Sequence, residues 1–212
     1  MSTSIEATPL LIFPFNGNGL EAIDCLGGTF RLLGFVDDTP DKQDDNGCGA
    51  AVFPRSALSQ WPAAQVLAVP GSPVSFRSRR AVIESLGIAP GRFARVIHPT
   101  ARVSPLATLG HNVLIMAGVV VTSNAVIGDH VCVLPNTVIH HDVRIGAWSL
   151  IGSNVTVAGN THVGENCYIG SGSSVMNALE IGDGTLVGLG SNVIRNTAVG
   201  SRVAGNPARP MQ

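Results

Sequence analysis

The chain has 212 residues, of which 45% are hydrophobic and only 13% charged, and its formal net charge at pH 7 is −1. This balance argues against the clustered Lys and Arg of a nucleic-acid-binding protein. The sequence contains no run of about 18 apolar residues, so we expect no membrane span. The opening residues MSTSIEATP lack the basic segment and long apolar core of a signal peptide.

The first 96 residues alternate between short apolar runs and segments compatible with helix. Apolar runs predict buried strands, and longer amphipathic segments ended by Gly predict helices. The expected elements are strands at 10–13, 31–36 and 66–69, helices at 20–26 and 75–86, and a polar surface loop at 39–49. Strands that alternate with helices indicate a small parallel α/β unit, which resembles half of a Rossmann domain.

A glycine-rich segment follows the first expected strand. Gly17, Asn18 and Gly19 begin a G-x-G-x-x-A pattern just before the expected helix, and Asp37 lies about twenty residues further on. Glycines in this context let backbone amides and a helix N-terminus hold a diphosphate. Because 96 residues provide only one mononucleotide half, we expect a nucleotide-linked small molecule rather than NAD. The alternative is a tight strand–helix turn with no ligand.

The second part of the chain is a hexapeptide repeat. An aliphatic residue, always Ile, Val or Leu, occupies every sixth position from Ile97 to Val199, eighteen times without interruption. Period six fits neither a helix nor a single strand, but it fits short strands separated by bends. Three repeats make one coil of eighteen residues, so we expect about six stacked coils with the aliphatic side chains inside. Gly residues that often follow the aliphatic site are expected to allow a bend with positive φ.

These patterns predict a small α/β domain over residues 1–96 and a parallel β-helix over residues 97–212. The low charged fraction is typical of a solenoid whose sides are partly covered by other subunits. Four cysteines, Cys25, Cys48, Cys132 and Cys167, show no metal or disulfide spacing and are expected to be reduced, as in a cytoplasmic protein. Cys167 is expected inside the β-helix as a small apolar residue.

Position 141 carries the strongest candidate for catalysis. His141 and Asp142 follow the inward Ile139 near an expected corner of the coil. A histidine can remove a proton near neutral pH, and an adjacent carboxylate can orient its ring. One coil later the same position is Gly159, which leaves space for a pantetheine arm and offers an N–H to an oxyanion. The alternative is an exposed corner histidine without a catalytic role.

The remaining histidines have simpler interpretations. His140 is expected to shape the site, whereas His98, His111, His130 and His162 are expected at the surface or at contacts between subunits. A zinc site between β-helices is a rival, since it would need histidines that converge from neighbouring chains. The five-residue histidine spacing typical of such sites is not present in this sequence, so we expect no metal.

The whole chain resembles the hexapeptide sugar acetyltransferases of sialic-acid and bacillosamine pathways. Four segments carry this resemblance: the Gly-x-Gly turn at 17–19, a strand that ends in paired acids at 35–38, the His–acid segment at 138–146, and the closing Gly-x-Pro-Ala-Arg at 205–209. The resemblance implies a left-handed β-helix, a homotrimer with active sites between subunits, acetyl-CoA between adjacent β-helices, and a nucleotide-linked amino sugar on the N-terminal domain.

The resemblance also assigns residues. It implies catalysis by His141 and Asp142. The implied contacts to the nucleotide sugar are Gly17, Asn18, Gly19, Asp37, Asp38 and Gly71, and the implied contacts to CoA are Gly159, Ser171, Leu189, Gly205 and Pro207. Three positions depart from the family pattern. Asn18 replaces a usual His, Leu150 replaces a His found in some members, and Leu134 replaces an Asn, so the acyl group or sugar can differ from those of well-known members.

The sequence therefore predicts an acetyl-CoA-dependent N-acetyltransferase of a nucleotide-linked amino sugar. Two alternatives stay open at this point. One is an O-acetyltransferase that acts on a sugar hydroxyl or on sialic acid, because the same base would serve. The other is a trimer that binds nucleotide without catalysis. Nothing in the sequence selects the nucleotide, the sugar or the acyl length.

Overall fold

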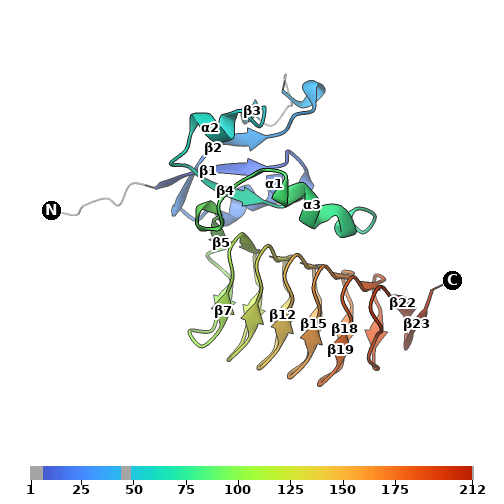
Figure 1. Cartoon of the computed structure of the whole chain (residues 1–212). Helices are drawn as coiled ribbons and strands as arrows, with labels where there is room; N and C mark the ends of the chain where they lie inside the picture. Colours follow the sequence, from blue (N-terminus) through green and yellow to red (C-terminus); the bar gives the residue numbers. More distant parts are fainter. Residues whose placement is uncertain (1–6, 44–48, 212) are drawn as a thin grey trace.

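The computed structural model describes residues 7–43 and 49–211. Figure 1 shows an α/β part that contains the N-terminal strands, and a prism of stacked coils that continues to the C-terminus. The predicted boundary between residues 96 and 97 falls inside β5 (Arg95–Ile97), the strand in which the coils begin. No helix in the described residues is long and apolar enough to cross a membrane.

A four-stranded parallel sheet with the order β3-β2-β1-β4 forms the centre of the α/β part. Its strands are β1 (Thr8–Phe13), β2 (Phe30–Val36), β3 (Val52–Phe53) and β4 (Gln65–Ala68). Leu10, Leu11 and Ile12 are fully buried, as expected of a parallel strand that is covered on both faces. The three predicted strands are confirmed, whereas β3 is too short to produce a hydrophobic pattern.

The helices of the α/β part are short. They are α1 (Gly17–Glu21) with the 3₁₀ turn η1 (Ala22–Cys25), η2 (Pro40–Lys42), α2 (Ala57–Gln60), η3 (Phe76–Ser78), α3 (Arg79–Glu84) and η4 (Pro90–Arg92). The expected helix at 20–26 begins earlier, because the side chain of Asn16 caps it by accepting a hydrogen bond from the Gly19 N–H at 2.8 Å. The glycine-rich segment is therefore the first helical turn and not a preceding loop.

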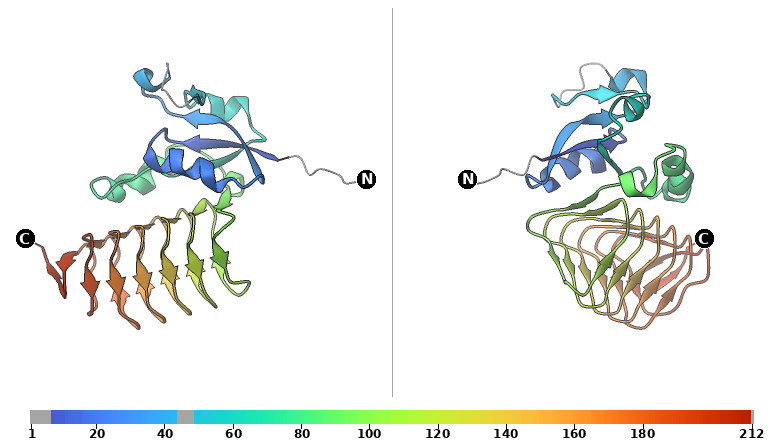
Figure 2. Two further views of the ribbon diagram at one scale, coloured as in Figure 1. Left: turned by 180° about the vertical axis from the view of Figure 1, so that it is seen from behind. Right: turned by 60° about the vertical axis from the view of Figure 1, so that its left-hand side comes forward.

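The coils form a triangular prism whose three sides are sheets of parallel strands, except that β22 and β23 at the C-terminal end pair antiparallel (Figure 2). The eight-stranded sheet contains β5, β8 (Val113–Ile115), β11 (Cys132–Val133), β14 (Leu150–Ile151), β17 (Tyr168–Ile169), β20 (Leu186–Val187), β22 (Arg202–Gly205) and β23 (Ala208–Pro210). The six-stranded sheet contains β6 (Arg102–Val103), β9 (Val120–Val121), β12 (Val138–Ile139), β15 (Thr156–Val157), β18 (Ser174–Val175) and β21 (Asn192–Val193). The five-stranded sheet contains β7 (Thr108–Leu109), β10 (Val126–Ile127), β13 (Arg144–Ile145), β16 (His162–Val163) and β19 (Glu180–Ile181).

Strand pairing follows the predicted coil of eighteen residues. Ile127 pairs with Ile145, and Ile145 pairs in turn with Val163. The aliphatic sites from Ile115 to Val193 are all buried, and Cys167 is fully buried among them as predicted. The prediction fails at the two ends, where Ile97 is 39% and Val199 is 75% exposed. The terminal coils lack a neighbour on one side, and in the last coil the pairing interval shortens, so that Val187 pairs with Val203.

The glycines after the aliphatic sites have a different role from the predicted one. Positive φ angles occur instead three residues after an aliphatic site, at positions such as Asn124, Asn136 and Asp142. A Cβ atom built on Gly128 would lie 2.7 Å from the backbone nitrogen of Ala147 in the next coil. Glycine is therefore needed there for the close approach of successive coils, while Asn or Asp occupies half of the fourteen left-handed positions from 112 to 190.

The eight-stranded sheet supports the α/β part. Leu114, Met116, Cys132 and Leu150 point outward from this sheet and belong to the same buried cluster as Leu10 of β1. Because apolar side chains from both parts share one cluster, the α/β part rests directly on one side of the prism.

Polar contacts fix the same junction. The Asn112 side chain accepts a hydrogen bond from the Ala68 N–H at 2.7 Å and donates one to the Ala68 carbonyl at 2.8 Å. Arg79, the first residue of α3, is 1% exposed and donates to the carbonyls of Pro70 and His130 at 2.9 and 2.7 Å. His130, expected at the surface, is half-buried and stacks on Trp148 with ring centroids 3.8 Å apart.

Removal of His130 should reduce the sensitivity of the fold to acid. Burial, followed by the nearby Arg79 guanidinium, lowers the pKa of His130 from 6.5 to about 4. Between these two pH values the unfolded chain binds a proton that the folded chain does not, so stability falls as the pH falls through this range. We expect the loss of unfolding free energy between pH 7 and pH 5 to be about 1 kcal/mol smaller in His130→Asn.

Asn suits this position because Asn112, one coil earlier, and Asn166, two coils later, share its positive φ. Urea unfolding of both proteins at the two pH values measures the difference. An equal loss of stability in the wild type and the variant would contradict the assignment.

Candidate active site

His141 and Asp142 lie at the edge where the six-stranded sheet turns into the five-stranded sheet, directly after β12. Asp142 has a φ of 59°, and this left-handed bend brings its carboxylate back to the preceding imidazole. Nδ1 of His141 lies 2.8 Å from Oδ2 of Asp142. The two neighbouring side chains therefore form the hydrogen-bonded pair that orients a general base.

Asn124 completes this pair and was not predicted. Its Nδ2 donates to Oδ1 of Asp142 at 3.1 Å, so both carboxylate oxygens have a partner. Hydrogen bonds from His141 and then Asn124 lower the pKa of Asp142 below its ordinary value. Asn124 stands eighteen residues before Asp142, so the coil length alone could have located it.

Gly159 lies against the imidazole, as the repeat predicted. A Cβ atom at this position would approach Cε1 and Nε2 of His141 to 2.6 Å. Any side chain would therefore displace the ring. Among the described residues, neither Nε2 of His141 nor the N–H of Gly159 is used in a hydrogen bond within the protein. The imidazole of His141 is 55% exposed. Its Nε2, as the base, and the N–H of Gly159, as a potential oxyanion donor, are both available to a ligand.

A second His–acid pair lies on the five-stranded sheet. Nδ1 of His162 is 3.1 Å from Oε2 of Glu180, and both side chains are exposed. This pair has no glycine that faces the ring. Within the described ranges, no group of three or more His, Cys, Asp or Glu residues is placed to hold a metal ion.

The predicted nucleotide-binding residues lie at the carboxyl ends of neighbouring parallel strands. Gly17, Asn18 and Gly19 form the start of α1 after β1, and Gly71 follows β4, which pairs with β1. Ligands of open α/β sheets bind at this edge, where the strand order reverses. A Cβ atom on Gly19 would lie 2.6 Å from the Pro14 carbonyl oxygen, whereas one on Gly17 would meet nothing within 4 Å. Gly19 is thus required by packing, and Gly17 faces open space.

The paired acids have partners inside the protein. Asp37 is 6% exposed, and its carboxylate receives hydrogen bonds from Nζ of Lys42 at 2.8 Å and the Thr39 N–H at 3.0 Å. Burial raises the pKa of Asp37, but the hydrogen bonds from Lys42 and Thr39 outweigh it and hold the pKa below its ordinary value. Asp38 forms an ion pair of 2.7 Å with Arg55. No sequence pattern indicated Lys42 or Arg55.

Both acids border a cavity of about 550 Å³. Its other lining residues are Phe13, Pro14, Thr39, Pro40, Arg55, Pro70 and Val82. The cavity thus lies beside the carboxyl end of β1, next to the start of α1. Of the predicted nucleotide-binding residues, Asp37 and Asp38 line it.

A smaller cavity, which we call the junction pocket, lies between the α/β part and the prism. It has a volume of about 190 Å³, and it is lined by Asn18, Gly71, Ser72, Pro73, Leu134, Leu150, Ile151, Gly152 and Tyr168. Gly71 adopts a positive φ of 125°, and a Cβ atom on it would lie 2.8 Å from Cδ1 of Leu150. Asn18, Leu134 and Leu150, the three departures from the family pattern, therefore all line this pocket.

The predicted CoA contacts fall on two different edges of the prism. Ser171 and Leu189 are eighteen residues apart on the edge between the eight- and six-stranded sheets. Gly205 lies close by, since its N–H donates to Oγ of Ser191 at 3.1 Å, and Pro207 is in the turn between β22 and β23. Gly159 lies on the other edge of the six-stranded sheet, beside His141. One chain thus does not bring all five residues together.

One chain also does not bring His141 to the nucleotide site. The α/β part covers the eight-stranded sheet (Figure 2). His141 lies at the opposite edge of the triangular coil, between β12 of the six-stranded sheet and β13 of the five-stranded sheet. Six residues per side at about 3.3 Å each make a side of up to about 20 Å. The two sets of predicted site residues therefore lie on opposite sides of the prism.

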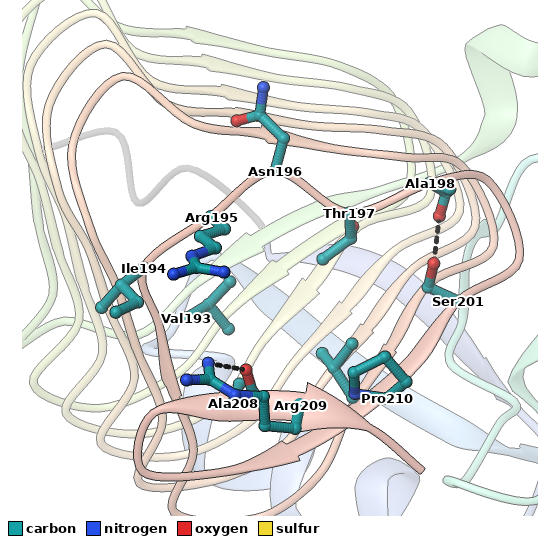
Figure 3. Close-up of a pocket in the computed structure, with 11 residues that line it drawn as sticks. Val193, Ile194, Arg195, Asn196, Thr197, Ala198, Ser201, Ala208, Arg209 and Pro210 are labelled. Atoms are coloured by element: carbon teal, nitrogen blue, oxygen red, sulfur yellow. Dashed lines mark hydrogen bonds between the residues drawn. The ribbon is translucent and has the colours of Figure 1, made fainter. Parts of the chain in front are cut away.

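A further cavity of about 300 Å³ opens at the C-terminal end of the prism (Figure 3). It lies between β21 and the β22–β23 hairpin, and Arg195 and Arg209 are among its lining residues. None of the predicted site residues lines it. It is the open end of the solenoid, beyond which no further coil is stacked.

Comparison with known proteins agrees with this fold. The family model of the bacterial transferase hexapeptide (six repeats) matches residues 106–140 and 124–159. The acetyltransferase domain of PglB from Neisseria gonorrhoeae, solved with acetyl coenzyme A, is 27% identical with a TM-score of 0.84 over 97% of this chain and 100% of that chain. No curated protein sequence matches significantly.

Two further solved structures are similar over nearly the whole chain. PerB from Caulobacter crescentus, in complex with CoA and GDP-perosamine, is 26% identical with a TM-score of 0.83 over 97% of this chain and 98% of that chain. WeeI from Acinetobacter baumannii, at 22% identity, shares the fold with a TM-score of 0.82 over 97% of this chain and 100% of that chain.

The repeat and the two-part fold match those of hexapeptide-repeat acetyltransferases with a left-handed parallel β-helix. The solved acetyltransferase structures match this chain over nearly its full length, so they define its activity more closely than the repeat alone. The chain is an acetyltransferase of the same type as the PglB domain and PerB.

Proposed function

We propose that this protein transfers the acetyl group of acetyl-CoA to the amino group of a nucleotide-linked amino sugar. The observation that carries the proposal is the site at 141, where an oriented imidazole faces a glycine that leaves room for a ligand. The glycine-initiated helix α1 at the carboxyl end of β1 provides a place for the diphosphate. PerB, which has the same two-part fold, is solved with CoA and GDP-perosamine.

Each residue of the site has a defined task in this mechanism. Nε2 of His141 accepts a proton from the amine as its nitrogen attacks the thioester carbonyl carbon. Asp142 holds the Nδ1 proton and stabilises the imidazolium, and Asn124 holds Asp142 in place. The N–H of Gly159 donates to the oxyanion. The C–S bond then breaks, and the CoA thiolate leaves as the thiol with the proton from His141.

We propose further that the functional unit is a homotrimer with active sites between subunits. The nucleotide site and His141 lie on opposite sides of one chain, so a neighbouring chain must supply one of them. The predicted CoA-binding residues are also separated within one chain. Gly159 lies on the edge between the six- and five-stranded sheets, and Ser171 and Leu189 lie on the edge between the eight- and six-stranded sheets. A cyclic assembly places the first edge of one chain beside the second edge of the next.

We place this reaction in the cytoplasm. Cys25, Cys132 and Cys167 are all free and buried in the structure. Three unpaired thiols are typical of a reducing compartment.

A CoA-release assay tests the reaction. Purified protein is incubated with acetyl-CoA and a panel of nucleotide-linked 3-amino and 4-amino sugars, and the product mass is determined before and after mild alkali. We expect CoA release with one acceptor and one added acetyl group that survives alkali, because amides persist. Loss of the acetyl group in alkali would indicate an ester and overturn N-acetylation, and the absence of release with every amino sugar would overturn the proposal.

A further inference from the structure

The junction pocket has two chemically different walls. The wall from the α/β part carries the polar side chains of Asn18 and Ser72, together with Gly71 and Pro73. The wall from the prism presents Leu134, Leu150 and Tyr168, whereas the side chain of Ile151 lies inside the prism. An alkyl group is stabilised by burial on the second wall, whereas sugar hydroxyls need the hydrogen-bonding groups of the first.

The same pocket lies between the predicted binding site of the acceptor diphosphate and the predicted CoA contacts. Asn18 is in the first turn of α1, where we place the diphosphate of the acceptor. Gly152 lines the pocket and is followed by Ser153 at a corner of the coil. Ser171 and Leu189 occupy the same corner position one and two coils later. The N–H of Ser153 donates to Oγ of Ser171 at 3.0 Å, so this column is continuous. A pantetheine arm that follows the column toward α1 ends at Leu150.

We infer that the junction pocket receives the acyl group of the donor, and that its leucine wall admits acyl chains longer than acetyl. The inference rests on the proposed function, since it assigns the donor end of the same site. Leu150 is 6% exposed and touches Gly71 across the pocket. A cavity of about 190 Å³ with this apolar wall on one side remains beside it, which is more space than one methyl group fills.

The expected result is a broad donor range. Each methylene that packs into an apolar pocket changes kcat/KM by about 10-fold or more. We therefore expect propionyl-CoA and butyryl-CoA to be used with kcat/KM at least equal to that of acetyl-CoA. Butyryl-CoA should also bind at least as tightly as acetyl-CoA when the dissociation constants are measured by calorimetry without acceptor.

Two variants fill the pocket. Leu150→Phe and Leu134→Phe should each lower kcat/KM for butyryl-CoA relative to acetyl-CoA by about 10-fold or more. Leu134 is only partly buried, so its variant keeps the test valid if Leu150→Phe does not fold. The matched control is Leu106→Phe, the same substitution at a side chain that is 65% exposed at a distant corner of the first coil. It should leave the ratio unchanged.

The outcomes separate this inference from the proposed function. Acetyl transfer together with butyryl-CoA kcat/KM more than 100-fold below that of acetyl-CoA would overturn the inference alone. The inference is also overturned if the variants raise the KM of the acceptor and leave the acyl-CoA ratio unchanged, because the sugar would then occupy the pocket. If no acceptor is used, the proposed function fails, and tighter binding of butyryl-CoA than of acetyl-CoA still supports the inference.

Discussion

His141→Ala is expected to lower kcat by about 10²–10⁴, which is the usual contribution of a general base. The variant removes the only group at this corner that can take the amine proton through Nε2, while Asp142 and Asn124 stay in place. The imidazole is 55% exposed, so its loss leaves no buried cavity and the melting temperature should change by no more than about 2 °C. Steady-state kinetics and thermal unfolding of the same preparation measure both effects.

His162→Ala is the matched control for this variant. Its Nδ1 contacts Glu180 at 3.1 Å, as that of His141 contacts Asp142 at 2.8 Å, and both imidazoles are about half exposed. The two pairs differ in that a glycine faces only His141. We expect His162→Ala to keep kcat within about twofold. A His141→Ala enzyme that keeps more than a tenth of the wild-type kcat would contradict the mechanism.

The interior of the prism could be predicted from the sequence because the aliphatic residue at every sixth position determines where each strand lies and how many residues one coil contains. Ile115 to Val193 are buried as expected, and the pairing interval is eighteen. Val199 departs from the pattern because burial requires a coil on each side, and a residue pattern does not show where the stack ends. The last coil also shortens, as the pairing of Ile181 with Thr197 shows.

The catalytic corner was predictable in part. Adding eighteen to position 141 located Gly159, and subtracting eighteen from 142 would have located Asn124 in the same way. The contact between His141 and Asp142 depends on the positive φ of Asp142, which the residue type favours but does not require. The sequence pattern led us to expect the positive φ at the glycines that follow the aliphatic sites, but these glycines instead allow close packing between coils.

The junction between the two parts could not be predicted, since it depends on contacts far apart in sequence. Arg79 is one of three arginines in the basic helix expected at 75–86, and nothing in the sequence sets it apart, yet its guanidinium is buried against the carbonyl of His130. Leu134 and Leu150 appeared as unexplained replacements. Only the three-dimensional arrangement shows that they face the same pocket as Asn18 and Gly71.

Mixing two inactive variants should restore activity if the active site lies between subunits. The first variant is His141→Ala. The second is Gly17→Glu, in which a carboxylate occupies the open space at the start of α1, where a Cβ atom meets nothing within 4 Å. The added charge repels a diphosphate without a steric clash. We expect each variant alone to be nearly inactive, since each removes one half of every site.

In assemblies formed from equal amounts of the two chains, one site in four combines an intact α/β part with an intact His141 from its neighbour. Co-expression or joint refolding, followed by kinetic assay, should therefore recover about a quarter of the wild-type kcat per site. Native mass spectrometry of the mixture shows whether both chains are present in one assembly. Mixed assemblies without activity would mean that each chain uses its own His141. That result would require its α/β part to reach around the prism, against the contacts of Asn112 and Arg79 that fix it to the eight-stranded sheet.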